Sequence, residues 1–158
     1  YKFPGGVILN KDISKVYDVD LRKDDEVQEF VTHSWYEYSV GNDKGLHPWK
    51  GESKVKYTGP KPPFEHLNTN EKYSYLKTPR WKGNAVEVGP LARMLVGYAR
   101  GREDFKAVVD KALTDLQVPV TALFSTLGRT AARGLESMLV KDWALEFYDK
   151  LIENIKSS

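Results

Sequence analysis

The sequence predicts a mainly helical chain with a small β portion, an α+β fold. Apolar residues recur at helical spacing through most of residues 89–158, whereas residues 41–88 are irregular and rich in proline and aromatic side chains. Residues 1–23 contain only short runs that favour β structure. With 158 residues the chain is long enough to bury one core, so one domain over residues 1–158 is the default expectation.

The first 40 residues are expected to form a hairpin and then a helix. Val7-Ile8-Leu9 and Val16-Tyr17-Asp18-Val19 favour β structure, and a turn-forming stretch separates them, so residues 1–23 are predicted to be extended. Asp24-Asp25-Glu26 then place carboxylates where the dipole of a helix start favours them. Apolar residues follow at spacings of three and four, which predicts a helix over residues 24–40.

Residues 89–158 are predicted to hold three helices. Pro90 suits a first helical turn, and a second helix is expected from Glu103 to Gln117. The third keeps helical period over residues 125–155, with Ser125 as its N-cap. Unbroken, it would span roughly 45 Å, whereas a compact domain of this size is only about 39 Å across. Gly128 and Gly134 inside it predict either a close approach of another helix or a break.

The irregular region, residues 41–88, is long for a loop inside one compact domain. Disordered segments are usually poor in aromatic residues, but this region is rich in them. We therefore expect it to pack against protein outside the chain. Its prolines and aromatics include Trp49, Tyr57, Pro60, Pro62, Pro63, Phe64, Tyr73 and Tyr75.

Composition excludes several classes of function. The 24 basic and 22 acidic residues are mixed along the chain and leave a net charge of +2, so no basic face for nucleic acid is predicted. Apolar runs are far shorter than the roughly 20 residues of a transmembrane helix, so we expect a soluble segment without membrane insertion. The chain has no cysteine, which excludes a disulfide scaffold and a thiol nucleophile.

Four sequence blocks combine Gly, Pro, Arg and aromatic residues at a spacing too idiosyncratic for generic core. They are HSWYEY at 33–38, GLHPWKG at 45–51, YLKTPRWKGNAVEVGPLAR at 75–93 and LFSTLGRTAAR at 123–133. In this order the blocks resemble the nickel-iron hydrogenase large subunit over nearly the whole chain. The resemblance implies a helical-bundle segment of that subunit's fold. It also implies a parent enzyme that reversibly oxidises dihydrogen to protons and electrons.

The resemblance also implies the cofactors and partners of the parent enzyme. Its centre contains nickel and iron with diatomic ligands on the iron, is held by four cysteine thiolates, and has a magnesium ion nearby. Its partners are the remainder of the large subunit and an iron-sulfur small subunit, in a prokaryotic enzyme that is periplasmic or associated with a membrane. Because this chain has no cysteine, it is expected to be an internal segment that binds no cofactor and is inactive alone.

Two residues are candidates for a role near the metals. By block position, Glu37 and Lys77 resemble a glutamate and a lysine that hold waters of the magnesium ion, which keeps several waters in proteins. The alternative is an exposed Glu and Lys, or a surface ion pair of about 0–1 kcal/mol. The histidines at 33, 47 and 66 match no compact metal-ligand spacing and are expected to be structural.

Arg80, Glu87 and Arg93 are structural or interface candidates. The arginines suit bidentate contacts with carboxylates. Glu87 is expected to support a helix N-terminus, or otherwise to pair with Arg80 or Arg93. The sequence thus leaves two functions open: a framework segment of a hydrogenase large subunit, or a non-catalytic interaction domain derived from the same family.

Overall fold

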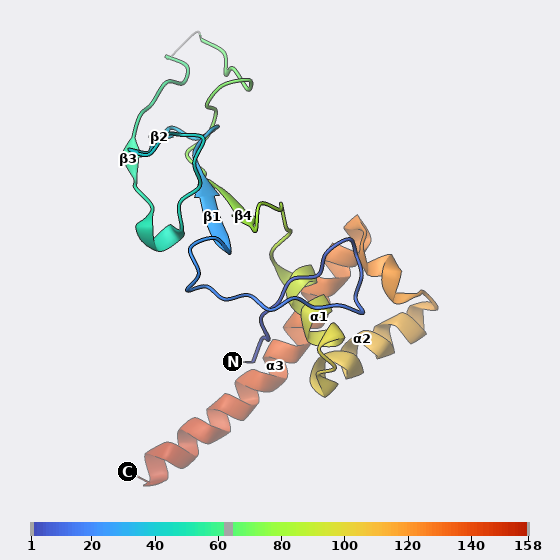
Figure 1. Ribbon diagram of the computed structural model, residues 1–158. Helices are drawn as coiled ribbons and strands as arrows, with labels where there is room; N and C mark the ends of the chain where they lie inside the picture. Colours follow the sequence, from blue (N-terminus) through green and yellow to red (C-terminus); the bar gives the residue numbers. More distant parts are fainter. Residues whose placement is uncertain (1, 62–64, 158) are drawn as a thin grey trace. The chain divides into compact units, whose positions relative to one another are not determined.

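The chain folds into two compact units. The computed structural model describes residues 2–61 and 65–157; Pro62, Pro63 and Phe64 of the predicted irregular region lie outside the described residues. The helical unit comprises Tyr1–Val19 and Glu87–Ser158, and the β unit comprises Asp20–Val86 (Figure 1). No feature of the sequence predicted this division.

The helical unit contains the three predicted helices, and the ends of the second and third lie within two residues of those expected. They are α1 (Pro90–Ala99), α2 (Glu103–Leu116) and α3 (Thr126–Ser157), and the short 3-10 helix η2 (Val120–Leu123) leads into α3. The small β elements elsewhere complete the α+β class, which is confirmed. None of the helices in the described ranges is long and apolar enough to span a membrane.

The core of the helical unit lies where the three helices meet. Phe105 of α2 is fully buried, and its ring lies 5.8 Å from the ring of Trp143 on α3. On α1, a Cβ atom at Gly97 would lie 2.3 Å from the Phe105 ring, so glycine allows α1 and α2 to approach closely. The other buried residues of this core are Leu91, Met94, Leu95, Val109, Leu123, Ala132 and Leu139.

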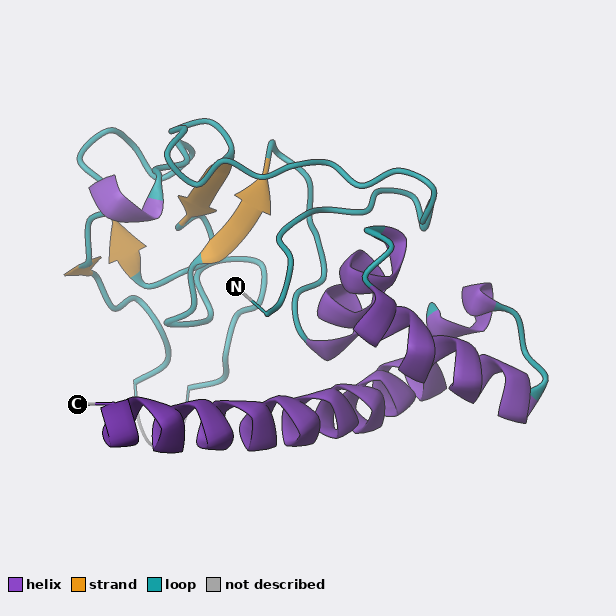
Figure 2. Ribbon diagram, turned by 90° about the horizontal axis from the view of Figure 1, so that it is seen from below, coloured by secondary structure: helices purple, strands orange, loops and turns teal. Residues whose placement is uncertain are grey.

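Helix α3 is continuous over its 32 residues (Figure 2). The Ser125 hydroxyl accepts a hydrogen bond from the Gly128 N–H at 3.0 Å, which confirms the predicted N-cap. A Cβ atom at Gly128 would lie 2.1 Å from the Leu123 carbonyl oxygen, so this glycine lets η2 fold back against the helix. Gly128 therefore marks a close approach, and neither glycine breaks the helix.

The β unit contains two small antiparallel pairs. Strand β1 (Val27–Phe30) pairs with β4 (Thr78–Trp81), and β2 (Tyr36–Glu37) pairs with β3 (Lys54–Val55). A 3-10 helix, η1 (Pro48–Lys50), lies between β2 and β3 in the chain. The rest of this unit is loop and turn.

The helix predicted over residues 24–40 is wrong, because β1 and β2 occupy this segment. Glu26 does not cap a helix; its carboxylate is buried, accepts the Trp81 indole N–H at 3.2 Å and lies 3.0 Å from the Lys82 ammonium. The Lys82 hydrogen bond, followed by the Asp20 N–H, lowers the pKa of Glu26. Trp81 and Lys82 lie more than 50 residues from Glu26 in the sequence. Pairing between distant segments therefore overrides a local apolar spacing that only resembles that of a helix.

The hairpin predicted for residues 1–23 is reduced to one antiparallel pair. Val7 and Tyr17 exchange two backbone hydrogen bonds of 2.9 Å, and no longer strand forms within the described part of this segment. Arg100, which follows α1, donates to the Gly5 carbonyl at 3.1 Å and pairs with Asp18. The start of the chain is thus fixed onto the helical unit.

Candidate functional site

The residues 33–38 block is held in place by residues 72–76. The Trp35 N–H donates to the Ser74 carbonyl at 2.8 Å, and its indole N–H donates to the Lys72 carbonyl at 3.1 Å. The Tyr73 N–H donates to the His33 carbonyl at 3.0 Å, and the Ser34 hydroxyl to the Leu76 carbonyl. Two segments about 40 residues apart therefore form one structural piece.

Lys72 is the centre of this piece. Its ammonium donates to three backbone carbonyls, those of Val31 at 2.9 Å, Ser34 at 2.7 Å and Tyr36 at 2.6 Å. Partial burial lowers the pKa of Lys72, because burial disfavours the charged form. An ammonium has three N–H donors, and this cage of carbonyls uses all of them, so Lys72 fixes the backbone that leads into Glu37.

Glu37 lies in β2 and pairs with Lys54 of β3 and with Lys56, which directly follows β3. Its carboxylate lies 2.8 Å from the Lys56 ammonium and 3.4 Å from that of Lys54. The hydrogen bond from Lys56, followed by that from Lys54, lowers the pKa of Glu37, so it is ionised at neutral pH. The Glu37 side chain is 30% exposed and can accept further hydrogen bonds.

Lys77 lies in a different environment within the β unit. Its side chain is 16% exposed, and its ammonium lies 3.5 Å from the Glu29 carboxylate and donates to the Glu52 carbonyl at 2.8 Å. The ammonium also lies 5.6 Å from the centre of the Tyr36 ring and 5.3 Å from that of the Tyr38 ring. The Tyr38 hydroxyl is buried without a hydrogen-bond partner among the described residues.

The structure does not bring Glu37 and Lys77 together. Successive strand residues point to opposite faces, so Glu37 points away from the face that Tyr36 presents to Lys77. Both candidates are therefore ordered in the same unit, and each has its own set of charged partners.

Two ion pairs connect the residues 75–93 block to α3. The Glu87 carboxylate accepts two hydrogen bonds from Arg129, at 2.7 and 2.6 Å, and this contact lowers the pKa of Glu87. Glu87 was expected to support the N-terminus of α1 or to pair with Arg80 or Arg93. Instead it pairs with Arg129 of α3, and no side chain caps α1 among the described residues. Arg93 makes a similar bidentate contact with Glu136, which raises the pKa of Arg93.

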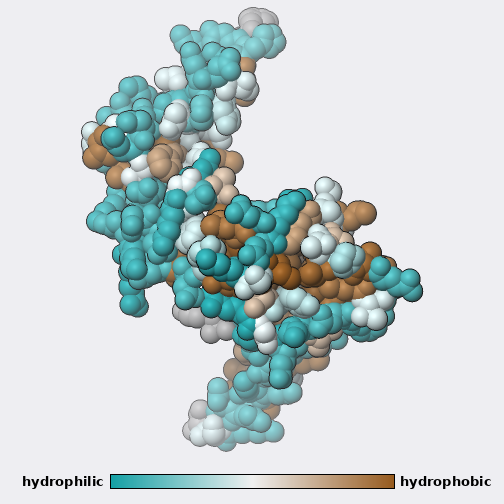
Figure 3. Space-filling view, turned by 45° about the vertical axis from the view of Figure 1, so that its right-hand side comes forward, coloured by the Kyte–Doolittle hydropathy of each residue, from teal (hydrophilic) through white to brown (hydrophobic). Residues whose placement is uncertain are grey.

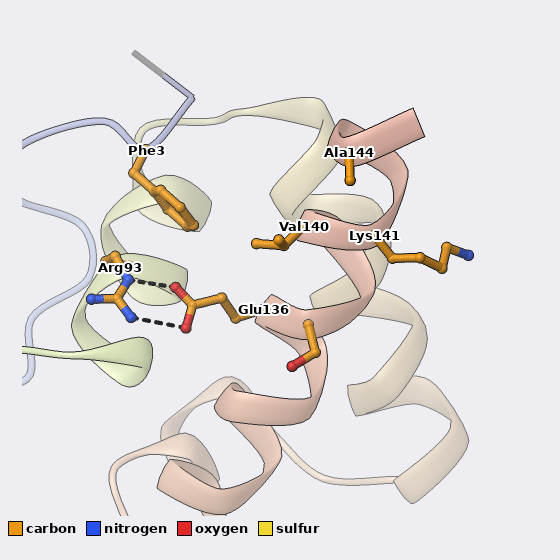
Figure 4. A pocket seen from close by; sticks show the side chains of 7 residues that line it. Phe3, Arg93, Glu136, Val140, Lys141 and Ala144 are labelled. Carbon is orange, nitrogen blue, oxygen red and sulfur yellow. Dashed lines mark hydrogen bonds and ion pairs between the residues drawn. The ribbon is translucent and has the colours of Figure 1, made fainter. Parts of the chain in front are cut away.

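The Arg93–Glu136 pair borders an open pocket of about 630 Å³ (Figure 4). In Figure 4 Phe3, Val140 and Ala144 supply apolar walls, and the guanidinium and carboxylate face one another. Glu136 accepts from Nε and from one terminal nitrogen of Arg93, and the surface of the pocket is mainly apolar. Arg80 lies elsewhere, in the β unit, and donates to the carbonyl of its neighbour Pro79 at 2.8 Å.

His47 and His33 each make hydrogen bonds to the backbone. The His47 imidazole is buried, accepts the Trp49 N–H at 3.2 Å and lies 2.9 Å from the Leu21 carbonyl. With Nδ1 accepting from Trp49, Nε2 is the nitrogen that donates to the Leu21 carbonyl. His33 contacts the Glu71 carbonyl and stacks on Tyr73. No cluster of three acidic or histidine side chains able to hold a metal occurs in the described ranges.

Comparison with known proteins gives one consistent family. The family model for nickel-dependent hydrogenases matches residues 1–158. The chain belongs to this family. The uptake hydrogenase large subunit of Bradyrhizobium diazoefficiens is 52% identical over 99% of this chain and 27% of that protein. The Escherichia coli hydrogenase-1 large chain is 41% identical over 98% of this chain and 26% of that protein. The chain therefore spans about a quarter of the length of these relatives.

Solved hydrogenase structures share the fold. A [NiFeSe]-hydrogenase from Dm. baculatum matches 94% of this chain and 27% of its own, with a TM-score of 0.62 and 25% identity. The reduced Ni-Fe-Se hydrogenase from D. vulgaris Hildenborough matches 91% of this chain and 28% of its own, with a TM-score of 0.57 and 26% identity. The recognition made from the four sequence blocks is confirmed.

Membership of the nickel-dependent hydrogenases does not give this chain a nickel site of its own. A thiolate-held nickel-iron centre needs cysteine ligands, and the chain has none, so its residues do not fit that group. Four residues that organise the site were not predicted from the sequence: Lys72, Glu29, Arg129 and Glu136. Lys72 has no local signal, because its three carbonyl partners lie 36–41 residues away.

Proposed function

We propose that this chain is a segment of the large subunit of a nickel-iron hydrogenase that catalyses the reversible oxidation of dihydrogen to protons and electrons. The observation that carries the proposal is the family match over residues 1–158. The curated relatives named above are hydrogenase large subunits. The role of this segment is framework, and the metal-binding thiolates come from elsewhere in the parent subunit.

The parent enzyme would then have two partners for this segment. One is the remainder of the large subunit, because the chain spans only about a quarter of its relatives. The other is an iron-sulfur small subunit that carries the electrons away. By resemblance we place the parent enzyme in the periplasm or at a membrane of a prokaryote. Fractionation of the source cells, with detection of the large subunit, tests this placement.

The first experiment is to extend the reading frame in both directions and assay the complete protein. We expect the extended frame to supply four metal-binding cysteines, and the purified complex to oxidise dihydrogen with nickel bound. The competing function is a non-catalytic interaction domain derived from the same family. Stop codons at both ends of the present segment would favour that alternative and contradict the proposal.

We also propose that Glu37 and Lys77 support the outer shell of the parent's magnesium ion. Glu37 is ionised and partly exposed, so it can accept hydrogen bonds from metal-bound waters. Lys77 donates to the Glu52 carbonyl and lies near Glu29, so it supports the shell through its own contacts. Because Glu37 points to the face of β2 opposite the Tyr36 ring, which the Lys77 ammonium approaches, we assign the two residues separate points of support.

Substitutions in the complete enzyme test this role. Glu37→Gln and Lys77→Met should each lower magnesium content and hydrogen oxidation by about 10–100-fold while nickel content stays normal. Glu71→Gln and Lys44→Met change exposed residues of the same unit and serve as matched controls. Normal magnesium content and turnover in the Glu37 and Lys77 variants would contradict this role and leave both residues as members of ordinary ion pairs.

A further inference from the structure

Gly134 lies at a position where no described contact of this chain requires a glycine. It lies in the interior of α3 and is exposed, and a Cβ atom there would have nothing within 4 Å. Glycine is the least favourable residue for a helix interior after proline. Gly97 and Gly128 differ, because a Cβ atom at either would collide with the Phe105 ring or the Leu123 backbone. The reason for Gly134 therefore lies outside the described contacts.

A row of exposed apolar side chains runs along α3 through Gly134. Its large members recur at intervals that fit a seven-residue repeat, and between 51% and 82% of each residue is exposed. They are Leu127, Met138, Leu145, Tyr148 and Ile155. We call this row, together with Ala131 and Gly134, the α3 seam. It extends over about 42 Å of helix.

The α3 seam is separate from the face that α3 already buries. At 100° per residue, the seam lies roughly 150° around the helix from the core residues Ala132, Leu139 and Trp143. The buried residues of α3 end at Trp143, and in Figures 1 and 2 the helix continues well past α1 and α2. Figure 3 shows hydrophobic surface gathered over this helical unit. The seam thus lacks a partner within its own unit.

We propose that a second α-helix, from the part of the parent subunit outside this chain, packs along the α3 seam and approaches most closely at Gly134. The inference rests on the proposed function, which makes the chain a segment of a longer subunit. A repeat of 3.5 residues gives a partner helix at a crossing angle near 20°. Small residues at 131 and 134 let the two backbones come close.

The occupant is a helix outside this chain because the other candidates do not fit. Among the described residues of the β unit there is no α-helix, and α1 and α2 already bury their apolar faces in the core. About three quarters of the length of the relatives lies outside the matched segment. That length is ample for a partner helix.

A second copy of α3 is disfavoured by charge. Lys141 lies in the seam, so two parallel copies would place this lysine against itself. Asp142 and Asp149 flank one side of the seam, so antiparallel copies would place acidic residues against one another. The partner that fits carries a carboxylate opposite Lys141 and basic residues opposite Asp142 and Asp149.

The decisive test is the sign of a small substitution in the complete large subunit. Helix propensity alone predicts that Gly134→Ala raises the melting temperature. A helix packed on Gly134 predicts the opposite, a fall of at least about 3 °C for Gly134→Ala and a larger fall for Gly134→Leu. Glu153→Leu, on the same helix but outside the seam, is the matched control and should change little. A rise with Gly134→Ala overturns the proposal, even if Gly134→Leu fails to fold.

A photo-crosslinking amino acid at Leu145 or Tyr148 identifies the occupant in the assembled enzyme. We expect crosslinks to a helical peptide of the same large subunit outside residues 1–158. Crosslinks to a second copy, to the small subunit or within residues 1–158 would overturn the assignment. If the reading frame does not extend beyond this segment, the proposed function is wrong. If the subunit is complete and active but gives no crosslinks, only this inference is wrong.

Discussion

The two units of this chain are ordered in different ways. The helical unit is built from continuous helices with a shared apolar core, and neighbouring turns of one helix supply most of its backbone hydrogen bonds. The β unit has only short strands, and it is held together by backbone contacts between distant segments and by the half-buried Lys72. The spacing of apolar residues along the sequence therefore identifies a packed helix well. It does not identify a unit stabilised by contacts between residues about 40 positions apart.

The largest expected effect is in the core of the helical unit. Phe105→Ala removes a fully buried ring that packs edge-on against Phe3, with centres 6.0 Å apart, and against Trp143. We expect a loss of about 3–5 kcal/mol of unfolding free energy, measured by urea denaturation. Leu116→Ala, at the exposed end of α2, should change stability by less than about 1 kcal/mol. Equal effects at the two positions would show that the core is placed wrongly.

The next effect is in the β unit. Lys72→Met keeps the length of the side chain and removes the ammonium, leaving three carbonyls without their donor. We expect a cost of about 1.5–3 kcal/mol, seen as faster hydrogen exchange of the amides at 33–36 with α1 and α2 unchanged. Lys56→Met removes an exposed ion pair and should cost less than about 1 kcal/mol. Unchanged exchange in Lys72→Met would contradict the role of the carbonyl cage.

Much of the fold follows from the sequence where contacts are local. Pro90, the apolar period and the Ser125 cap predict the helices, because each signal acts within a few residues. The segment over residues 24–40 has similar spacings, but β1 pairs with β4 about 50 residues away. The spacing of apolar residues within a segment does not reveal a pairing partner about 50 residues away. The same pattern therefore predicts the helices of residues 89–158 correctly and the helix of residues 24–40 wrongly.

The candidate site is predictable to a smaller extent. The sequence blocks identify the family and single out Glu37, Lys77, Glu87 and Arg93. They do not identify the partners, because an ion pair such as Arg93 with Glu136 depends on how two helices pack. Glu87 illustrates the limit: its neighbours along the chain suggest capping, yet its carboxylate contacts Arg129 on α3.

A smaller effect is expected for the Glu87–Arg129 pair. Both side chains are 44% exposed, so solvent screens the attraction although the geometry is bidentate. A double-mutant cycle with Glu87→Gln and Arg129→Gln should give a coupling of about 0.2–1 kcal/mol that falls as salt rises. The cycle with Arg93 and Glu136, whose carboxylate is more buried, should give a larger coupling. The reverse order would contradict the burial seen here.

The smallest expected effect is a pH dependence at Glu146 on α3. Hydrogen bonds from Lys150 at 2.6 Å and from Lys2 lower the pKa of Glu146 to about 2, from a usual value of 4.5. Because the folded state lowers this pKa, the stabilisation is present above about pH 4.5 and is lost as pH falls toward 2. The unfolding free energies of wild type and Glu146→Gln should therefore differ by a constant amount from pH 7 to 5 and converge near pH 2. Glu153→Gln, with no ion pair among the described residues, is the control. A difference that grows on acidification would show that Glu146 is not held by these lysines.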